Sequence, residues 1–150
     1  MAYRRSPLPF QTENMPSTLA PNPNAMIIGV GIDIIEVERM RESLERHGDR
    51  FLEHVFTPAE IASAPAGLGR PAYFAARWAA KEAASKALGT GIGAGCGWHD
   101  IEVQKRPSGQ PYLTVTGAGA ATAATLAVRS FHVSYSHERG NACAVVIAEG

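Results

Sequence analysis

The pattern of apolar and polar positions changes at Met26. Residues 1–25 are rich in proline and asparagine and have neither a helical nor a strand period, which is typical of a segment that does not pack. Residues 26–35 instead form an apolar, β-branched run that is typical of a buried strand. We therefore expect a flexible extension over residues 1–25 and one folded domain over residues 26–150.

Four stretches have the spacing or the composition of helices. They begin or lie at residues 36–47, 58 onward, 72–88 and 117–128. The first has apolar positions at helical spacing and is expected to stop at Gly48. The second follows a capping box formed by Thr57 and Glu60, and the third is one long alanine-rich helix.

Alternating residues and turn signals predict two β-hairpins after the long helix. The first pairs residues 101–103 with 112–115 across a turn at 107–109. The second pairs residues 131–136 with 144–147. The expected fold class is α+β, with a largely antiparallel sheet packed with helices.

Composition narrows the class of protein. Lysine plus arginine equals aspartate plus glutamate at 14 each, so no strong field draws the chain to nucleic acid or to an anionic membrane. Cys96 and Cys143 lack a metal-ligand spacing, which predicts neither a disulfide framework nor a zinc site. No apolar run approaches the roughly 20 residues needed to span a bilayer. We expect a cytoplasmic protein without a membrane anchor.

The predicted first strand has two different faces. Alternation puts Val30 and Ile32 on an apolar face, and Gly29, Gly31 and Asp33 on a nearly bare one. Bare backbone beside a carboxylate would allow a ligand or a metal to approach closely. Alternatively, another element packs against the glycines and the carboxylate caps the following helix.

The alanine-rich helix carries an acid and a base on one face, because Glu82 and Lys86 are four residues apart. They could form an ordinary solvated pair of little energetic weight. They could also serve as a ligand for a hard cation and as a partner for phosphate. Since Mg²⁺ typically takes one or two protein carboxylates, Asp33 and Glu82 could be that pair.

Two further segments leave their roles open. The glycine-rich loop from Gly89 to Gly97 could offer N–H groups to phosphates, but it lacks the ending of a P-loop. In the later strand, alternation aligns His132 with Ser134 and Ser136 on one face. His132 could make a structural hydrogen bond or contact a phosphate, and the sequence favours neither role. No nucleophile elbow surrounds these serines.

Taken in order, these segments resemble the short, stand-alone holo-acyl-carrier-protein synthases of the phosphopantetheinyl transferase superfamily. The resemblance covers nearly all of residues 26–150. Its motifs are Gly29-Val30-Gly31-Ile32-Asp33-Ile34 with Arg39, Arg77-Trp78-Ala79-Ala80-Lys81-Glu82-Ala83 with Lys86, and His132-Val133-Ser134-Tyr135-Ser136-His137. The extension has no counterpart in the usual short form, and Trp78 stands where phenylalanine is common.

The resemblance implies an α+β phosphopantetheinyl transferase fold in which Asp33 and Glu82 hold Mg²⁺ against the pyrophosphate of coenzyme A. The residues that it implies for coenzyme A binding are Arg77, Lys86, Gly89 and His132. A serine of an acyl carrier protein, deprotonated by Glu82 or by a metal-activated water, would attack the pantetheine-side phosphorus. Adenosine 3′,5′-bisphosphate would leave, with Lys86 and the metal stabilising its charge.

The resemblance also implies an acyl carrier protein docked at Arg39, and a homotrimer with active sites at subunit contacts. Two other functions remain compatible with the residues. One is a metal-dependent nucleotide pyrophosphohydrolase, although such enzymes usually carry denser acidic clusters. The other is a non-catalytic module that binds carrier proteins, which the intact set of Asp33, Glu82 and Lys86 disfavours.

Overall fold

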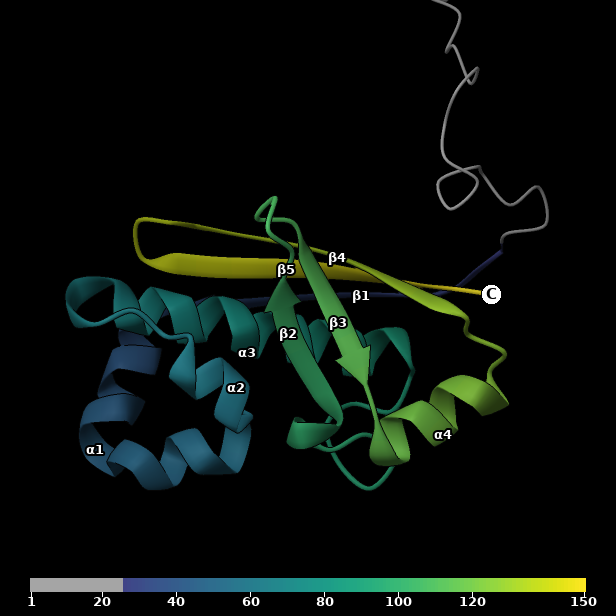
Figure 1. The fold of residues 1–150 in the computed structure, drawn as a ribbon, viewed down its shortest axis with the longest axis horizontal. Coiled ribbons are helices and arrows are strands. Elements are labelled where there is room, and N and C mark those ends of the chain that lie inside the picture. Colours follow the sequence, from purple (N-terminus) through teal and green to yellow (C-terminus); the bar gives the residue numbers. More distant parts are fainter. Residues whose placement is uncertain (1–25) are drawn as a thin grey trace, which may run out of the picture.

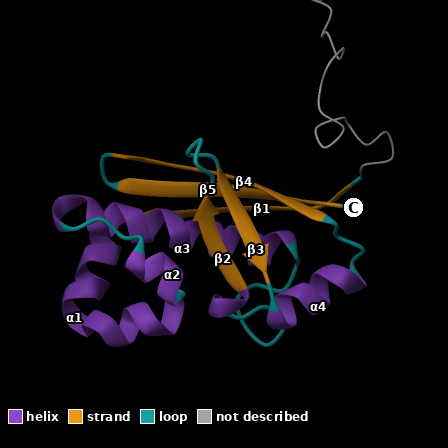
Figure 2. Cartoon of the chain, viewed as in Figure 1, coloured by secondary structure: helices purple, strands orange, loops and turns teal. Residues whose placement is uncertain are grey.

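The computed structural model describes residues 26–150 and shows a three-stranded antiparallel sheet lying over a layer of helices (Figure 1). A separate two-stranded hairpin and a short helix complete the domain (Figure 2). The prediction for residues 1–25 lies outside the described residues. The elements are β1 (Ile27–Glu36), α1 (Val37–Val55), α2 (Pro58–Ala62), α3 (Arg70–Ala87), β2 (Ile101–Lys105), β3 (Pro111–Val115), α4 (Gly117–Thr125), β4 (Ser130–Glu138) and β5 (Asn141–Glu149).

The sheet confirms the predicted α+β fold class. Its strand order is β1-β5-β4, and both pairings are antiparallel. The strands β2 and β3 form the first predicted hairpin, and β4 and β5 form the second. In the part of the chain from Met26 onward, no helix is long and apolar enough to cross a membrane.

The prediction that the first strand is buried is wrong. Strand β1 lies at the edge of the sheet, and its apolar face points outward. Val30 is 58% exposed, and Ile32 and Ile34 are each 68% exposed. The apolar composition of this strand therefore does not reflect burial of its outer face in the core of the chain.

Helix α3 packs on the inner face of the sheet, and it explains the glycines of β1. A side-chain carbon at Gly31 would lie 1.8 Å from the carbonyl oxygen of Ala83, and one at Gly29 would lie 1.9 Å from that of Ala87. Only glycine allows the helix backbone to approach so closely. The alternative in which another element packs against the glycines is therefore the correct one, and no ligand reaches them.

The first helix is interrupted at Gly48, as predicted, because this residue has a non-helical φ of 53° and ψ of −137°. A second helical segment, which the sequence did not predict, follows the kink and continues α1 to Val55. The capping box at α2 is confirmed, since Glu60 and Thr57 each accept a hydrogen bond from the other's backbone N–H.

A buried ion pair joins α2, α3 and β2. The ammonium of Lys81 lies 2.8 Å from Oε2 of Glu60 and donates to the carbonyl oxygens of Trp98 and Ile101 at 2.8 and 2.6 Å. The other carboxylate oxygen of Glu60 accepts from the backbone N–H of Val103 at 2.9 Å. Burial lowers the pKa of Lys81, and the charge of Glu60 opposes that shift. All three ammonium hydrogens thus have partners.

Candidate functional site

Three charged side chains meet where the inner face of β1 lies beside the second half of α3. Lys86 donates to Oδ1 of Asp33 at 2.9 Å and to the carbonyl oxygen of Ile32 at 3.1 Å. Glu82 lies one turn before Lys86 on the same helix. We call Asp33, Glu82 and Lys86 the carboxylate site. The structure thus brings together the residues predicted as metal ligands and phosphate partner.

The three groups of the carboxylate site act on one another electrostatically. Burial and the negative charge of Asp33 raise the pKa of Glu82, while Lys86 acts in the opposite sense. The hydrogen bond to Asp33 raises the pKa of Lys86. Lys86 therefore pairs with Asp33 across two elements, and the alternative of an ordinary pair between Glu82 and Lys86 is wrong. Nor does Asp33 cap α1, since Lys86 is its hydrogen-bond partner.

The carboxylate site fits a hard divalent cation. Asp33 and Glu82 supply carboxylate oxygens from two elements. Burial and the charge of Asp33 both raise the pKa of Glu82, and a cation would relieve the repulsion between the two carboxylates. Among residues 26–150, no group of three or more His, Cys, Asp or Glu side chains is arranged to hold a metal. Two carboxylates are nevertheless the usual protein contribution to Mg²⁺, which keeps its other positions for water and phosphate.

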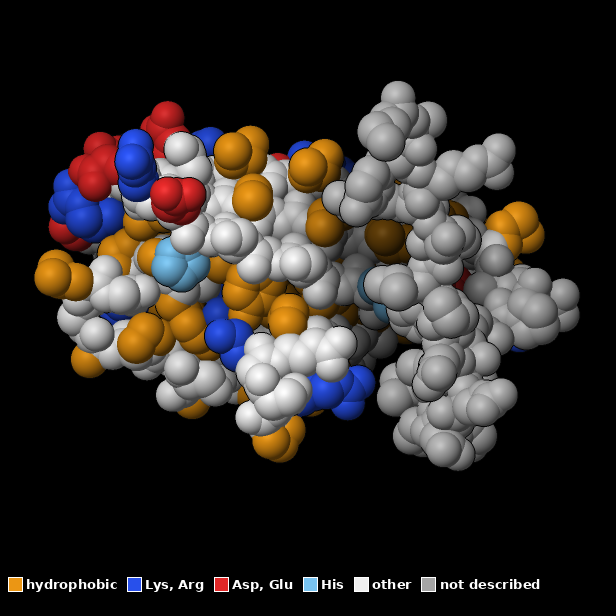
Figure 3. Space-filling model, turned by 90° about the horizontal axis from the view of Figure 1, so that it is seen from above, with side chains coloured by type: hydrophobic (Ala, Val, Ile, Leu, Met, Phe, Trp, Pro, Cys, Tyr) orange, Lys and Arg blue, Asp and Glu red, His pale blue; other side chains and the backbone are white. Residues whose placement is uncertain are grey.

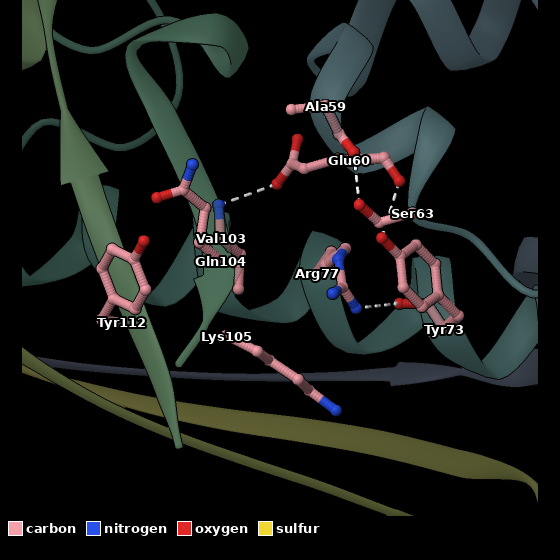
Figure 4. Close-up of a pocket in the computed structure, with 9 residues that line it drawn as sticks. All are labelled: Ala59, Glu60, Ser63, Tyr73, Arg77, Val103, Gln104, Lys105 and Tyr112. Atoms are coloured by element: carbon pink, nitrogen blue, oxygen red, sulfur yellow. Dashed lines mark hydrogen bonds between the residues drawn. The ribbon is translucent and has the colours of Figure 1, made fainter. Parts of the chain in front are cut away.

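A second polar feature lies beside α3, in a cavity of about 490 Å³ between α2, β2 and β3. Figure 4 shows Arg77 at its centre, between Tyr73 and Lys105. Arg77 is only 4% exposed, and its guanidinium lies 3.4 Å from the centre of the Tyr73 ring. Its Nε atom is buried and has no hydrogen-bond partner among the residues that the structure describes. The cavity, which we call the Arg77 pocket, is suited to an anion.

The strand register places the Arg77 pocket and the carboxylate site on opposite sides of α3. Asp33 and Tyr135 both stand opposite the buried Ala144 in β5, over which α3 packs. Asp33 therefore lies on one side of the helix and Tyr135 on the other. The two residues are two strand spacings apart, which is about 10 Å across the sheet. The ammonium of Lys105, a pocket residue, lies 5.8 Å from the Tyr135 ring. A single chain thus does not bring Arg77 to the predicted metal ligands.

His132 is also separate from the carboxylate site. It lies on the outer face of β4, and its Nε2 atom is 3.1 Å from Oε2 of Glu149. The sheet stands between it and Asp33, which faces α3. The predicted alignment of His132 with Ser134 and Ser136 on one face is confirmed, because all three are exposed and alternate with less exposed residues.

Gly89 follows directly after α3 and has a φ of 76°. Its N–H donates to the carbonyl oxygen of Lys86 at 3.0 Å, and the N–H groups of Thr90 and Gly91 donate to that of Ser85. The first N–H groups of the glycine loop therefore bond to carbonyl oxygens in the last turn of α3 and cap the C-terminal end of the helix. The predicted contact of Gly89 with coenzyme A remains a prediction, and in this conformation it cannot use the glycine's own N–H.

The outer face of the sheet is apolar in its β1 part. Figure 3 looks onto this side of the molecule and shows apolar side chains along its upper edge, most acidic residues at the left end, and basic residues both there and along the lower middle. The register pairs Val30 and Ile32 of β1 with Ile147 and Val145 of the central strand β5. On the other side of β5, His132 and Ser134 of β4 pair with the same two residues. His132 is therefore separated from the apolar side chains of β1 by the strand β5.

Arg39 lies on α1 and is exposed, as its spacing from the buried Met40 predicts. No ion pair joins Arg39 to another residue of the described part of the chain, including Glu42, which lies three residues later on the same helix. Arg41, two residues later, does form such pairs, with Glu38 and Glu45. Arg39 is a free positive charge close to the end of β1.

Comparisons with known proteins agree with one another. The family model of the 4′-phosphopantetheinyl transferase superfamily matches residues 29–146. The chain is 48% identical to a holo-[acyl-carrier-protein] synthase of Koribacter versatilis and 52% identical to one of Streptomyces griseus, in each case over 83% of this chain and at least 99% of the relative.

Solved structures show the same likeness. The fold is similar to that of a holo-[acyl-carrier-protein] synthase from Neisseria meningitidis, with a TM-score of 0.77 and 30% identity over 83% of this chain and 100% of that one. It is also similar to the Helicobacter pylori synthase in complex with coenzyme A, with a TM-score of 0.70 and 33% identity over 79% of this chain and 98% of that one.

Proposed function

This chain belongs to the 4′-phosphopantetheinyl transferase superfamily as a holo-[acyl-carrier-protein] synthase, and we propose that it moves phosphopantetheine from coenzyme A to a serine of apo-acyl carrier protein. The observation that supports this activity in the chain itself is the carboxylate site. Its two carboxylates and one ammonium come from two elements, β1 and α3, and meet at one point. We assign the activity to residues 26–150.

In the proposed reaction, Asp33 and Glu82 hold a divalent cation, taken to be Mg²⁺. Such a cation supplies positive charge that neutralises the pyrophosphate of coenzyme A. The serine oxygen of the carrier protein forms a bond to the pantetheine-side phosphorus, and Glu82 takes the serine proton directly or through one water molecule. The phosphorus–oxygen bond to the adenosine side breaks, and adenosine 3′,5′-bisphosphate leaves with the electron pair. Lys86 donates to the leaving phosphate as its charge develops.

Coenzyme A is proposed to bind between two copies of the chain. The carboxylate site and the Arg77 pocket lie on opposite sides of α3, so one copy cannot offer both to the same end of one molecule. Placing the carboxylate site of one copy beside the Arg77 pocket and His132 of the next would line the ligand with positive charge at both ends. This arrangement accounts for the separation that one chain shows.

The proposed assembly is a homotrimer joined through the outer face of the sheet. The open apolar side chains of β1 support this interface, because leaving Ile32 and Ile34 in water forfeits about 25 cal/mol for each Å² of apolar surface. The number three follows from the resemblance of the chain to trimeric members of its family.

A charge at the centre of this face is expected to separate the subunits. Ile32→Glu should convert the trimer to a monomer in analytical ultracentrifugation, because a carboxylate would be buried without a partner. Leu68→Glu is the matched control, since Leu68 is fully exposed in the turn before α3 and should not change the mass. A monomeric wild type, or a trimeric Ile32→Glu variant, would refute the interface.

The proposed function itself is tested by incubating the chain with coenzyme A, Mg²⁺ and an apo-acyl carrier protein, and then weighing the carrier by mass spectrometry. A gain of one phosphopantetheine, with release of adenosine 3′,5′-bisphosphate, is expected. Cleavage of coenzyme A without any gain by the carrier would instead identify a pyrophosphohydrolase. A complex with the carrier but no reaction would identify a binding module.

Arg39 is proposed to dock the acidic carrier protein. Arg39→Glu should raise the KM for the carrier about tenfold and make the rate more sensitive to salt, because a contact between opposite charges becomes a repulsion. The KM for coenzyme A should hardly change. Steady-state kinetics at two salt concentrations would measure this.

The control for this prediction is Arg41→Glu, which makes the same charge change on the same helix. Arg41 points about 200° away from Arg39 around the helix, and its guanidinium forms ion pairs with Glu38 and Glu45. It should leave the KM for the carrier near that of the wild type. Equal effects of the two substitutions would show that Arg39 has no special role in docking.

A further inference from the structure

We propose that Lys86 acts as a resident cation of the carboxylate site, which a divalent cation must displace from Asp33, so that the metal and coenzyme A bind cooperatively. The inference rests on the proposed function, because it takes Asp33 and Glu82 as the metal ligands. It concerns what Lys86 does before the substrate arrives, which is separate from its contact with the leaving phosphate.

The position of the ammonium carries the inference. Lys86 Nζ lies 2.9 Å from Oδ1 of Asp33 and 3.1 Å from the carbonyl oxygen of Ile32, so two acceptors of β1 hold it in place. The side chain of Asp33 is only 16% exposed. A cation approaching this largely enclosed carboxylate therefore finds one of its two oxygens, Oδ1, already hydrogen-bonded to an ammonium.

The charges of the carboxylate site explain what the ammonium does before a metal binds. Asp33 and Glu82 repel each other, and Lys86 opposes that repulsion. An ammonium at this position keeps two carboxylates in place without a metal. A divalent cation that reached Asp33 would instead meet a neighbouring positive charge, which weakens its binding.

Coenzyme A changes this balance, because its pyrophosphate offers Lys86 another partner. The side chain of Lys86 is 47% exposed, and its flexible four-carbon stem lets the ammonium leave Asp33 without moving α3. With the ammonium on a phosphate oxygen, the cation no longer competes with it for Asp33. Coenzyme A then raises the affinity of the protein for the metal. By thermodynamic linkage, the metal raises the affinity of the protein for coenzyme A by the same factor.

The test measures Mn²⁺ binding to the full chain by the electron paramagnetic resonance signal of free Mn²⁺. Without coenzyme A, Lys86→Met should bind Mn²⁺ about three- to tenfold more tightly than the wild type, because the competing charge is gone. With saturating coenzyme A, after subtraction of the Mn²⁺ that coenzyme A binds alone, this advantage should disappear. Lys86→Arg keeps the charge and should behave like the wild type.

The matched control is Arg46→Met, which removes one positive charge from an exposed position on α1 and should leave Mn²⁺ binding unchanged. If Lys86→Met binds free Mn²⁺ no more tightly than the wild type, the inference is wrong. The proposed function then still stands, provided that Asp33→Asn weakens Mn²⁺ binding in the presence of coenzyme A. If Asp33→Asn has no such effect, the metal site itself is misassigned and both proposals fail.

Discussion

Asp33→Asn and Glu82→Gln are each expected to lower the rate of phosphopantetheine transfer about 100-fold or more. A neutral amide keeps the shape of the side chain but binds a hard divalent cation poorly, and the pyrophosphate then loses the charge that neutralises it. The initial rate of carrier modification, followed by mass spectrometry, measures the effect. Excess chelator should inactivate the wild type, and added Mg²⁺ should restore it.

The matched control for these two substitutions is Glu53→Gln, which neutralises an exposed carboxylate on α1. It should retain the wild-type rate. Thermal unfolding of all the variants should show that they are folded, because Asp33 and Glu82 lie at the edge of the core and not inside it. Near-normal turnover in Asp33→Asn or Glu82→Gln, or in excess chelator, would contradict the metal assignment.

Local patterns were sufficient to predict the elements that carry the site. The capping box of Thr57 and Glu60, the alanine-rich helix and the two hairpins all lie where their spacing and turn residues predict. Alternation also predicted which residues of β1 share the face of Asp33. These features depend on neighbours close in the chain, which one sequence contains.

The outward position of the β1 apolar face could not be predicted in the same way. A β-branched apolar run is the same sequence signal whether its face is covered by a helix of its own chain or lies open to a second copy. The glycines of β1 indicate which face of the strand α3 covers. A strand face that a helix approaches this closely must be bare, so α3 had to pack on the glycine side.

The separation of Arg77 and His132 from the carboxylate site also lay beyond the sequence. Both residues belong to motifs that resemble one family's active site, but a motif does not say on which side of a helix or sheet its residues face. The side follows from the position of α3 across the strands, which is a tertiary property. The Arg77 pocket was missed for the same reason, because β2 and β3 supply four of its nine lining residues.

The buried position of Lys81 was not predicted, although the spacing of apolar residues around it indicates that position. Phe74 and Leu88 lie seven residues before and after it, and both are buried, so the heptad spacing places Lys81 on the same apolar face. A lysine on such a face needs an internal acid. The acid is Glu60, which the sequence marked only as half of a capping box.

Lys81→Met is expected to destabilise the folded chain by about 3–5 kcal/mol. The substitution keeps the length of the side chain but leaves the carboxylate of Glu60 buried without its cation, and it leaves the carbonyl oxygens of Trp98 and Ile101 without a donor. Urea unfolding at one fixed protein concentration, followed by tryptophan fluorescence, measures the change. Trp98 reports on the site directly because its own carbonyl is one of the partners.

The control is Lys105→Met, which removes an exposed ammonium that has no ion pair among residues 26–150. It should cost under about 1 kcal/mol, because an exposed charge keeps its hydration in both states. Adding Glu60→Leu to Lys81→Met should recover only part of the loss. Glu60 also accepts from the N–H groups of Thr57 and Val103, and these would then be buried without partners. A Lys81→Met variant as stable as Lys105→Met would show that the hydrogen-bonded ammonium is not what holds β2 against α3.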